Sequence, residues 1–363
     1  MNQLPVPQVK YPTAIDLHRE LNQLKKSSLS WMYGVSKCAP QEALRDLDKG
    51  YASLFRKQTK HPRFKSRRRG VGSFRLTGAI RVEAGVVQLP RLGRIRLKEK
   101  NYLPCDAKVL SATVSEKAGH WFVSLQVEEA ISVPENTNPT VGIDLCVGNK
   151  LAHCSDGVII ENPRAYRRFE RKKKRLNREV SRKKKGSNNR RKAVRKLGKL
   201  EYRIANVRKD ATHKATTMLT RTKSVIGMED LAVANMLKNP RLAKSISDAG
   251  VGEFYRQIQY KSEWYGSRLV TADRFFPSSK LCSNCGKVHA DLKLSDRVFK
   301  CPSCNFLIDR DLNASINLER LAVSSTENGN ACLSREVHFP AMEEVLGNDA
   351  GNECQGDYNV LFG

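Results

Sequence analysis

The sequence predicts an α/β protein in which a small antiparallel barrel precedes a larger domain of strands and helices. Short apolar segments rich in β-branched residues, separated by Gly and Pro, fill residues 73–128. Three more strand-like segments begin at Val141 and lead into a long helical stretch. Two Cys-x2-Cys pairs precede a final helix, which indicates a zinc site between the strands and that helix.

Composition excludes several classes of protein. The 363 residues suffice for two or three domains, and the chain has no apolar run long enough to cross a membrane and no secretory signal. We therefore expect a cytoplasmic protein without a membrane partner. The net charge is +28, from 65 basic and 37 acidic residues, which favours a polyanionic partner. A membrane-surface protein is the alternative, but no basic amphipathic helix with an aromatic-rich face supports it.

The first domain begins with two helices and continues with short strands. Apolar residues at helical spacing predict helices over 13–26 and 42–57. Strands are predicted at 74–77, 80–82, 86–89, 95–97, 109–114 and 122–127. The Pro- and Asn-rich segment 133–139 has the composition of a linker.

The second domain alternates strands and helices. Strands are predicted at 141–146, 150–154, 158–160, 224–228 and 268–272. Helices are predicted over 163–222, with a loop at 183–189, and over 254–265 and 311–321. The residues from 322 onward show no periodicity and are expected to be disordered.

Four cysteines have the spacing of a zinc site. Cys282 and Cys285 form one pair, and a fifteen-residue gap separates them from Cys301 and Cys304. Two such turns complete a tetrahedron of thiolates, so we expect a structural Zn²⁺ with no open coordination position. Incidental thiols are the alternative, which this spacing disfavours. Asn305 follows the second pair at a position that needs a left-handed backbone, which Asn tolerates.

Carboxylates lie beside apolar segments at three places. Asp144 stands between apolar residues in a predicted strand, Glu229-Asp230 ends another strand, and Asp309 and Asp311 open the last helix. A carboxylate carried into a sheet is costly unless it binds a cation or a partner. Three that converge on one edge would hold two Mg²⁺ ions for phosphodiester hydrolysis. As alternatives, Asp309 could be a helix N-cap and Glu229-Asp230 an exposed strand end.

Basic residues dominate the long helical stretch. Between Arg164 and Lys223, 25 Lys or Arg residues accompany four acids, an excess too large for salt bridges to balance. We therefore predict contacts with a nucleic-acid backbone rather than a merely solvated surface. Phe64, inside an earlier basic segment, adds a ring that could stack on a base. The predicted contact residues are Arg63, Lys65, Arg171, Lys172, Lys173, Lys174, Arg175, Arg182, Lys183, Lys184 and Lys185.

In this order, the motifs resemble the TnpB (OrfB) family, which many bacterial insertion sequences encode. The resemblance rests on the strands with Asp144 and Glu229 and on three segments near the C-terminal end. These segments are Pro277-Ser-Ser-Lys-Leu-Cys-Ser-Asn-Cys-Gly286, Cys301-Pro-Ser-Cys304 and Asp309-Arg-Asp-Leu-Asn-Ala314. Further matches are Pro62-Arg-Phe-Lys65, Leu89-Pro-Arg-Leu-Gly93, Asp248-Ala-Gly-Val-Gly-Glu-Phe254 and Tyr260-Lys-Ser-Glu-Trp-Tyr-Gly266, and all of them lie between residues 13 and 320.

The resemblance implies an RNase H-like (RuvC-like) nuclease domain with an inserted zinc ribbon, preceded by an oligonucleotide-binding β-barrel with a helical insertion. It implies an RNA-guided endodeoxyribonuclease, related to type V CRISPR effectors, that uses a transposon-derived guide RNA to cut double-stranded DNA. Asp144, Glu229 and Asp311 then carry over as the catalytic acids and Mg²⁺ ligands. The expected boundaries are 1–135 for the helical segment and barrel, 136–275 for the first part of the nuclease domain, 276–306 for the ribbon, 307–322 for the last nuclease helix and 323–363 for a disordered tail.

The sequence departs from the family pattern in two places that matter for function. The family usually begins with an additional strand and helix, so the chain is expected to be N-terminally truncated. Cys146 stands where the family usually has Gly, close to the first acid. The competing hypothesis is therefore a non-cleaving RNA-guided DNA-binding protein or a truncated, inactive transposon remnant, against which the three intact acids argue. A transposase that joins DNA strands itself would have the same acids and is a third hypothesis.

Overall fold

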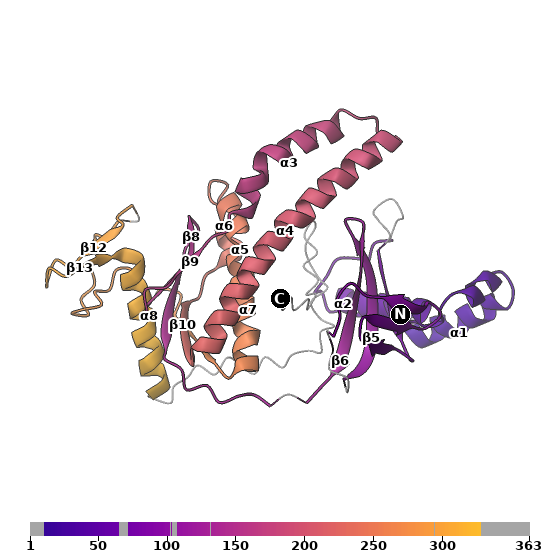
Figure 1. Ribbon diagram of the computed structural model, residues 1–363, viewed down its shortest axis with the longest axis horizontal. Helices are drawn as coiled ribbons and strands as arrows, with labels where there is room; N and C mark the ends of the chain where they lie inside the picture. The colour runs from indigo at the N-terminus through magenta and orange to yellow at the C-terminus, as the bar shows by residue number, and fades with distance from the viewer. Residues whose placement is uncertain are drawn as a thin grey trace, which may run out of the picture. The chain divides into compact units, whose positions relative to one another are not determined.

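The computed structural model describes residues 11–64, 72–101, 103, 107–130, 132–293 and 295–327 (Figure 1). The chain forms two compact units, and among the described residues the first ends at 130 and the second begins at 132. Lys65, one of the predicted nucleic-acid contacts, lies outside the described residues. None of the described helices is long and apolar enough to cross a membrane.

Helices open the first unit. Helix α1 (Ala14–Lys25) starts with a capping box, in which the Thr13 side chain accepts from the Asp16 backbone N–H and the Asp16 carboxylate accepts from Thr13. A short 3₁₀ helix, η1 (Ser30–Gly34), precedes α2 (Cys38–Phe55). Both predicted helices are confirmed, although α2 begins at Cys38 rather than at residue 42.

The strands of the first unit form two antiparallel sheets. One has the order β1-β5-β6, and the other has the order β2-β3-β4. Leu76 and Ala112 of the first sheet share a core with Val87 and Leu89 of the second. The predicted antiparallel strands are therefore confirmed, and they surround one core as two three-stranded sheets. Their bounds are Ser73–Thr77 (β1), Arg81–Glu83 (β2), Val86–Leu89 (β3), Gly93–Arg96 (β4), Lys108–Lys117 (β5) and His120–Glu128 (β6).

A five-stranded mixed sheet is the centre of the second unit. Its order is β11-β10-β7-β8-β9, in which β7, β8 and β9 pair antiparallel and β10 is parallel to both β7 and β11. Because β7 and β10 are parallel, their carboxyl ends reach the same edge of the sheet. The bounds are Val141–Leu145 (β7), Lys150–Cys154 (β8), Ile159–Glu161 (β9), Val225–Glu229 (β10) and Arg268–Ala272 (β11).

Helices cover both faces of this sheet (Figure 1). On one face, Leu219, Phe254 and Ile258 pack in one core with Ile143 and Met228 of the strands. On the other face lies the C-terminal helix α8. The helices of the unit are α3 (Ala165–Ser181), α4 (Asn188–Thr222), α5 (Val233–Met236), α6 (Ala243–Ala249), α7 (Val251–Tyr265) and α8 (Arg310–Glu327).

Two glycines let α8 lie directly on the strands. A Cβ at Gly142 of β7 would overlap the Ser315 carbonyl oxygen, and one at Gly227 of β10 would overlap the Leu318 carbonyl oxygen. Only glycine permits such a close approach of helix and sheet backbones. This packing fixes where the first turn of α8 meets the end of β7.

Helices α3 and α4 form a long antiparallel pair (Figure 1). Leu176 of α3 packs with Leu200 and Ile204 of α4, and the predicted interruption appears as the turn between Ser181 and Asn188. The first turn of α3 has no side-chain cap of its own. Asp248 of α6 supplies one, because its carboxylate accepts from the backbone N–H groups of Tyr166 (2.7 Å) and Arg167 (3.1 Å).

The cysteine segment forms a small ribbon with the strands β12 (Val298–Lys300) and β13 (Leu307–Asp309). Gly286 and Asn305 follow the two cysteine pairs with φ of 72° and 58°, which confirms the left-handed turn predicted for Asn305. The last helix continues to Glu327, so the predicted start of the tail at residue 323 is wrong. Just before the expected start of the tail, Ala322 is buried against the sheet at Gly227. The rest of the predicted tail lies outside the described residues.

Candidate functional site

The first candidate site joins the end of β7 to the start of α8. Asp144 of β7, Cys146 just beyond it and Asp311 in the first turn of α8 have ligand atoms within 4.8 Å of one another. The Cys146 Sγ lies 3.7 Å from Asp144 Oδ2 and 3.7 Å from Asp311 Oδ2. The guanidinium of Arg310 contacts the other oxygen of Asp311 at 3.1 Å. Asp144 and Asp311, 167 positions apart in the chain, thus belong to one cluster of possible metal ligands.

Glu229 reaches the same edge of the sheet from the neighbouring strand. Met228 pairs with Ile143, so Glu229 and Asp144 are the next residues on two parallel strands and leave the same face of the sheet. The Glu229 carboxylate accepts a hydrogen bond from the hydroxyl of Ser278, which is almost fully buried. Glu229 is not one of the three residues whose ligand atoms lie within 4.8 Å.

Crowding of acids changes the protonation of this site. Burial, followed by the charges of Glu229 and Asp311, raises the pKa of Asp144 to about 8. Burial and the two neighbouring aspartates also raise the pKa of the Cys146 thiol far above its ordinary value. A bound cation would offset the repulsion between these groups, so the donor set fits a divalent metal.

The neighbouring acids have structural roles. Asp309 caps α8, because its Oδ1 accepts from the backbone N–H groups of Asp311 (2.9 Å) and Leu312 (3.1 Å). Asp230 forms an ion pair with Arg274 at the surface. The N-cap considered for Asp309 is therefore confirmed, and Asp230 is paired with a basic side chain.

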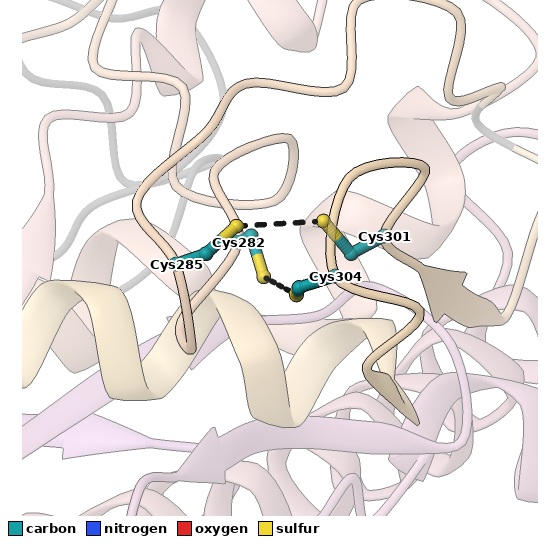
Figure 2. A group of neighbouring side chains, drawn as sticks. All are labelled: Cys282, Cys285, Cys301 and Cys304. Carbon is teal, nitrogen blue, oxygen red and sulfur yellow. Dashed lines mark hydrogen bonds between the residues drawn. The ribbon is translucent and has the colours of Figure 1, made fainter.

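The second candidate site is the group of four thiols in the ribbon (Figure 2). The Sγ atoms of Cys282 and Cys304 are 3.8 Å apart, and those of Cys285 and Cys301 are 3.6 Å apart. Four sulfurs placed 2.3 Å from one Zn²⁺ at the corners of a tetrahedron are about 3.8 Å from one another. The four thiols therefore fit a tetrahedral zinc ion, as the spacing predicted.

Two asparagines of α8 hold the ribbon against the helix. Asn313 accepts from the backbone N–H of Ser283 (2.9 Å) and donates to the carbonyl of Leu281 (2.7 Å). Asn317 donates to the carbonyl of Ser278 (2.8 Å), and both asparagine side chains are buried. The segment that begins the zinc site is thereby tied to the helix that carries Asp311. Ser278, which precedes the first cysteine pair, donates a hydrogen bond to Glu229. Hydrogen bonds therefore connect the ribbon to the acids at the edge of the sheet.

The hairpin of α3 and α4 presents most of the predicted nucleic-acid contacts. Lys173, Lys174 and Lys183 each form an ion pair with a glutamate of the hairpin. The other predicted residues of the hairpin are exposed and form no ion pair with any described residue. These are Arg171, Lys172, Arg175, Arg182, Lys184 and Lys185. Arg63 is also exposed, and the Phe64 ring beside it is fully exposed.

A basic hollow lies along α3 near the tip of the hairpin. Arg175, Arg178, Arg182, Lys183 and a single acid, Glu179, line it. Arg178 was not among the predicted contacts, although its spacing of three and four residues from Arg175 and Arg182 places all three on one helix face. This surface has the charge expected for binding phosphates.

Family models match most of the second unit and part of the first. Residues 112–240 match the family described as "Probable transposase", and residues 252–318 match "Cas12f1-like, TNB domain". A "Putative RNA-guided DNA endonuclease" of Streptomyces pristinaespiralis is 39% identical over 308 residues, which cover 84% of this chain and 76% of the relative. The protein InsQ of Escherichia coli (strain K12), with the same description, is 33% identical over 77% of this chain and 72% of its own length. The chain belongs to the TnpB (OrfB) family.

A solved structure shares the fold. The protein in the "Cryo-EM structure of the Cas12f1-sgRNA-target DNA complex" superposes with a TM-score of 0.51 at 16% identity, over 85% of this chain and 79% of that one. The mixed α/β architecture predicted from the sequence is thus confirmed. The residues that sequence reasoning missed in this TnpB-family chain are Ser278, Arg178, and the asparagines 313 and 317 as anchors of the ribbon. The two asparagines were visible four residues apart in the last helix, but their partners were not.

Proposed function

We propose that this TnpB-family chain is an RNA-guided DNA endonuclease with a RuvC-like active site formed by Asp144, Glu229 and Asp311. The observation that carries the proposal is the convergence of Asp144 and Asp311, from β7 and α8, on one buried edge beside the end of β10. Three antiparallel strands followed by two parallel ones, with a helix that brings an acid back to the first strand, suit an RNase H-like domain. Relatives described as a "Putative RNA-guided DNA endonuclease" support the same activity.

The three acids would bind Mg²⁺, which activates a water molecule and stabilises the leaving oxygen of a phosphodiester. Asp144 and Asp311 supply carboxylate oxygens from a rigid strand and from a helix whose position glycine packing fixes. Ser278 orients the carboxylate of Glu229 through its hydrogen bond. Burial and the neighbouring acids raise the pKa of Asp144 to about 8, and a bound cation would favour the ionised form of this carboxyl at neutral pH.

The four-thiol site has a different role in this proposal. Four thiolates fill the coordination of Zn²⁺ and leave no position for water, so the zinc is structural. The four cysteines would hold the ion within the ribbon, outside the chemistry of the acids, while Asn313 attaches the ribbon to α8. The antiparallel sheets of the first unit would serve as the oligonucleotide-binding barrel that the family resemblance implies.

The partners would be a guide RNA derived from the transposon and a double-stranded DNA target. The basic surface of α3, with Arg175, Arg178 and Arg182 on one side of the helix, would contact a nucleic-acid backbone. Backbone contacts position a duplex without reading its sequence, which suits a protein whose specificity comes from pairing with a guide.

The test is cleavage of a guide-matched DNA duplex by the protein purified with the RNA of its own locus. We expect Mg²⁺-dependent cleavage that falls at least about a hundredfold in Asp311→Asn, because several kcal/mol of charge stabilisation are lost. Asp309→Asn is the matched control, since Asn caps a helix as well as Asp does and the cleavage should persist. Equal cleavage by the wild type and Asp311→Asn would contradict the assignment of the acids.

The same experiment separates the competing hypotheses. Guide-dependent binding to the target without cleavage would identify a non-cleaving RNA-guided DNA-binding protein, and failure to bind RNA would identify an inactive remnant. Strand-joined products would identify a transposase. Cleavage without joining supports the endonuclease.

A further inference from the structure

A thiol occupies the centre of the acid cluster. Cys146 Sγ lies at the same distance, 3.7 Å, from one oxygen of Asp144 and one oxygen of Asp311. The single S–H proton of a thiol can donate to only one of these carboxylates at a time. The thiol proton can therefore satisfy only one of the two sulfur–oxygen contacts at a time.

The two sulfur–oxygen separations suit ligands on a small thiophilic cation. With a Zn–S bond of 2.3 Å and a Zn–O bond of 2.0 Å, tetrahedral ligands lie about 3.5 Å apart. The observed sulfur–oxygen separations of 3.7 Å are close to this value. Mg²⁺ prefers oxygen donors, whereas Zn²⁺ and its borderline-soft relatives also take thiolate and imidazole.

A second feature beside the cluster also indicates a metal. His153 of β8 pairs directly with Asp144, so the two side chains leave the same face of the sheet. His153 is 5% exposed, and its Nδ1 is buried without a hydrogen-bond partner among the described residues. A buried imidazole nitrogen is costly without a partner. A cation held by Asp144, or water bound to that cation, would give this nitrogen one.

We propose that Asp144, Cys146 and Asp311 form a binding site for Zn²⁺ and similar thiophilic divalent cations, distinct from the four-thiol site and in competition with Mg²⁺. Binding replaces the thiol proton of Cys146 with a metal–sulfur bond and releases that proton to solvent. The binding follows from the donor set alone. The consequence that zinc inhibits cleavage rests on the proposed nuclease function.

Cobalt absorbance tests the binding, because Co²⁺ bound to thiolate has charge-transfer bands that oxygen ligands do not give. The full-length protein, with zinc already in the ribbon, is titrated with Co²⁺ as wild type, Cys146→Ser and Cys146→Ala. Cys154→Ala is the matched control. This buried thiol lies on β8 opposite Ile143, on the other face of the sheet. Exchange of cobalt into the ribbon would be common to all four proteins and cancels in their differences.

Wild type and Cys154→Ala should show one additional thiolate–cobalt site that Mg²⁺ displaces. Both Cys146 variants should lose its charge-transfer band and bind Co²⁺ at least about tenfold more weakly, since even outer-shell changes cost ten- to a hundredfold in affinity. Retained zinc and an unchanged melting temperature show that each variant is folded. Identical difference spectra in wild type and Cys146→Ser overturn the proposal.

Inhibition by zinc is then measured for the wild type and for Cys146→Ser. For each protein, the cleavage rate with micromolar Zn²⁺ is divided by the rate without it, at the same Mg²⁺ concentration. The zinc concentration for half-inhibition should rise at least about tenfold in Cys146→Ser. Equal inhibition in both proteins would overturn competition at this site. If no variant cleaves DNA under any condition, the proposed function fails while the cobalt result still decides the metal site.

Discussion

The second unit holds two groups of candidate metal ligands that are assembled in opposite ways. The four thiols come from two tight turns within the segment 282–304, each closed by a residue with positive φ. The carboxylates of Asp144, Glu229 and Asp311 come from three elements that are far apart in the chain. The geometry of the thiol site is local, whereas the geometry of the acid site depends on how a helix packs on a sheet.

The two groups of ligands also differ in how the absence of a cation affects the fold. At the end of β7, burial and then the charges of Glu229 and Asp311 raise the pKa of Asp144 to about 8. The buried acids therefore destabilise the metal-free fold when they ionise, although metal binding needs them ionised. At the ribbon, a metal bound by the four thiols would organise the fold itself. Asn313 and Asn317 of α8 connect the two groups through the start of the ribbon.

The largest expected effect comes from breaking the packing that assembles the acid site. Gly142→Ala places a Cβ inside the backbone of α8, so α8 must move away from β7. We expect a loss of unfolding free energy of about 3 kcal/mol or more, measured by urea denaturation, together with loss of Mg²⁺-dependent cleavage. Gly198→Ala, in open space within α4, is the control and should stabilise the protein by up to about 1 kcal/mol. Equal stability of the two variants would show that α8 does not need this close approach.

Removal of zinc should have the next largest effect and should stay local. Cys282→Ser breaks the tetrahedron, and we expect the ribbon core around Phe299 to unfold while the separate sheet core persists. Hydrogen exchange should increase in the ribbon and at the start of α8, with protection retained in β7 and β10. Metal analysis should show loss of bound zinc. Full zinc content in this variant would contradict the four-thiol site.

These sites also show what the sequence could and could not predict. The spacing of the cysteines sufficed for the ribbon, because a Cys-x2-Cys turn brings its own two ligands together. The acids could be selected by their apolar flanks and by family resemblance. Their convergence depends on Gly142 and Gly227, whose role appears only once α8 is seen to lie on them.

Other features were beyond sequence reasoning for a similar reason. Ser278 looks like an ordinary turn residue until β10 places Glu229 beside it. The end of α8 was predicted too early because the last turn is polar, although Ala322 is buried against Gly227. Tertiary packing, rather than local propensity, determines both.

Replacing Asp144 with a neutral residue should stabilise the metal-free protein, in contrast to the loss of a zinc ligand in the ribbon. The folded-state pKa of Asp144, about 8, exceeds its ordinary value of 3.8, so the folded chain retains a proton that the unfolded chain releases. Stability from this group is therefore lost as pH rises from about 4 to about 8. Without divalent cations, Asp144→Asn should melt higher than wild type by a few degrees at pH 8, and the difference should shrink toward pH 5.

Added Mg²⁺ provides the control for this prediction. It should stabilise the wild type more at pH 8 than at pH 6, because its binding displaces a proton, and it should have little effect on Asp144→Asn. A melting difference that does not change with pH would contradict the raised pKa of Asp144.

The smallest effect is expected from loss of the hydrogen bond between Ser278, beside the thiol site, and Glu229 of the acid site. Ser278→Ala removes the hydroxyl that donates to Glu229 but leaves the backbone carbonyl that accepts from Asn317. Zinc content should be unchanged and stability should fall by only about 1 kcal/mol. The Mg²⁺ concentration for half-maximal cleavage should rise about tenfold, as is typical when a group that orients a metal ligand is lost. Ser324→Ala, which loses only a hydrogen bond to a carbonyl in the last turns of α8, should behave as wild type. If both variants need the same Mg²⁺ concentration, Glu229 is positioned without Ser278, and the ribbon acts on the acid site through α8 alone.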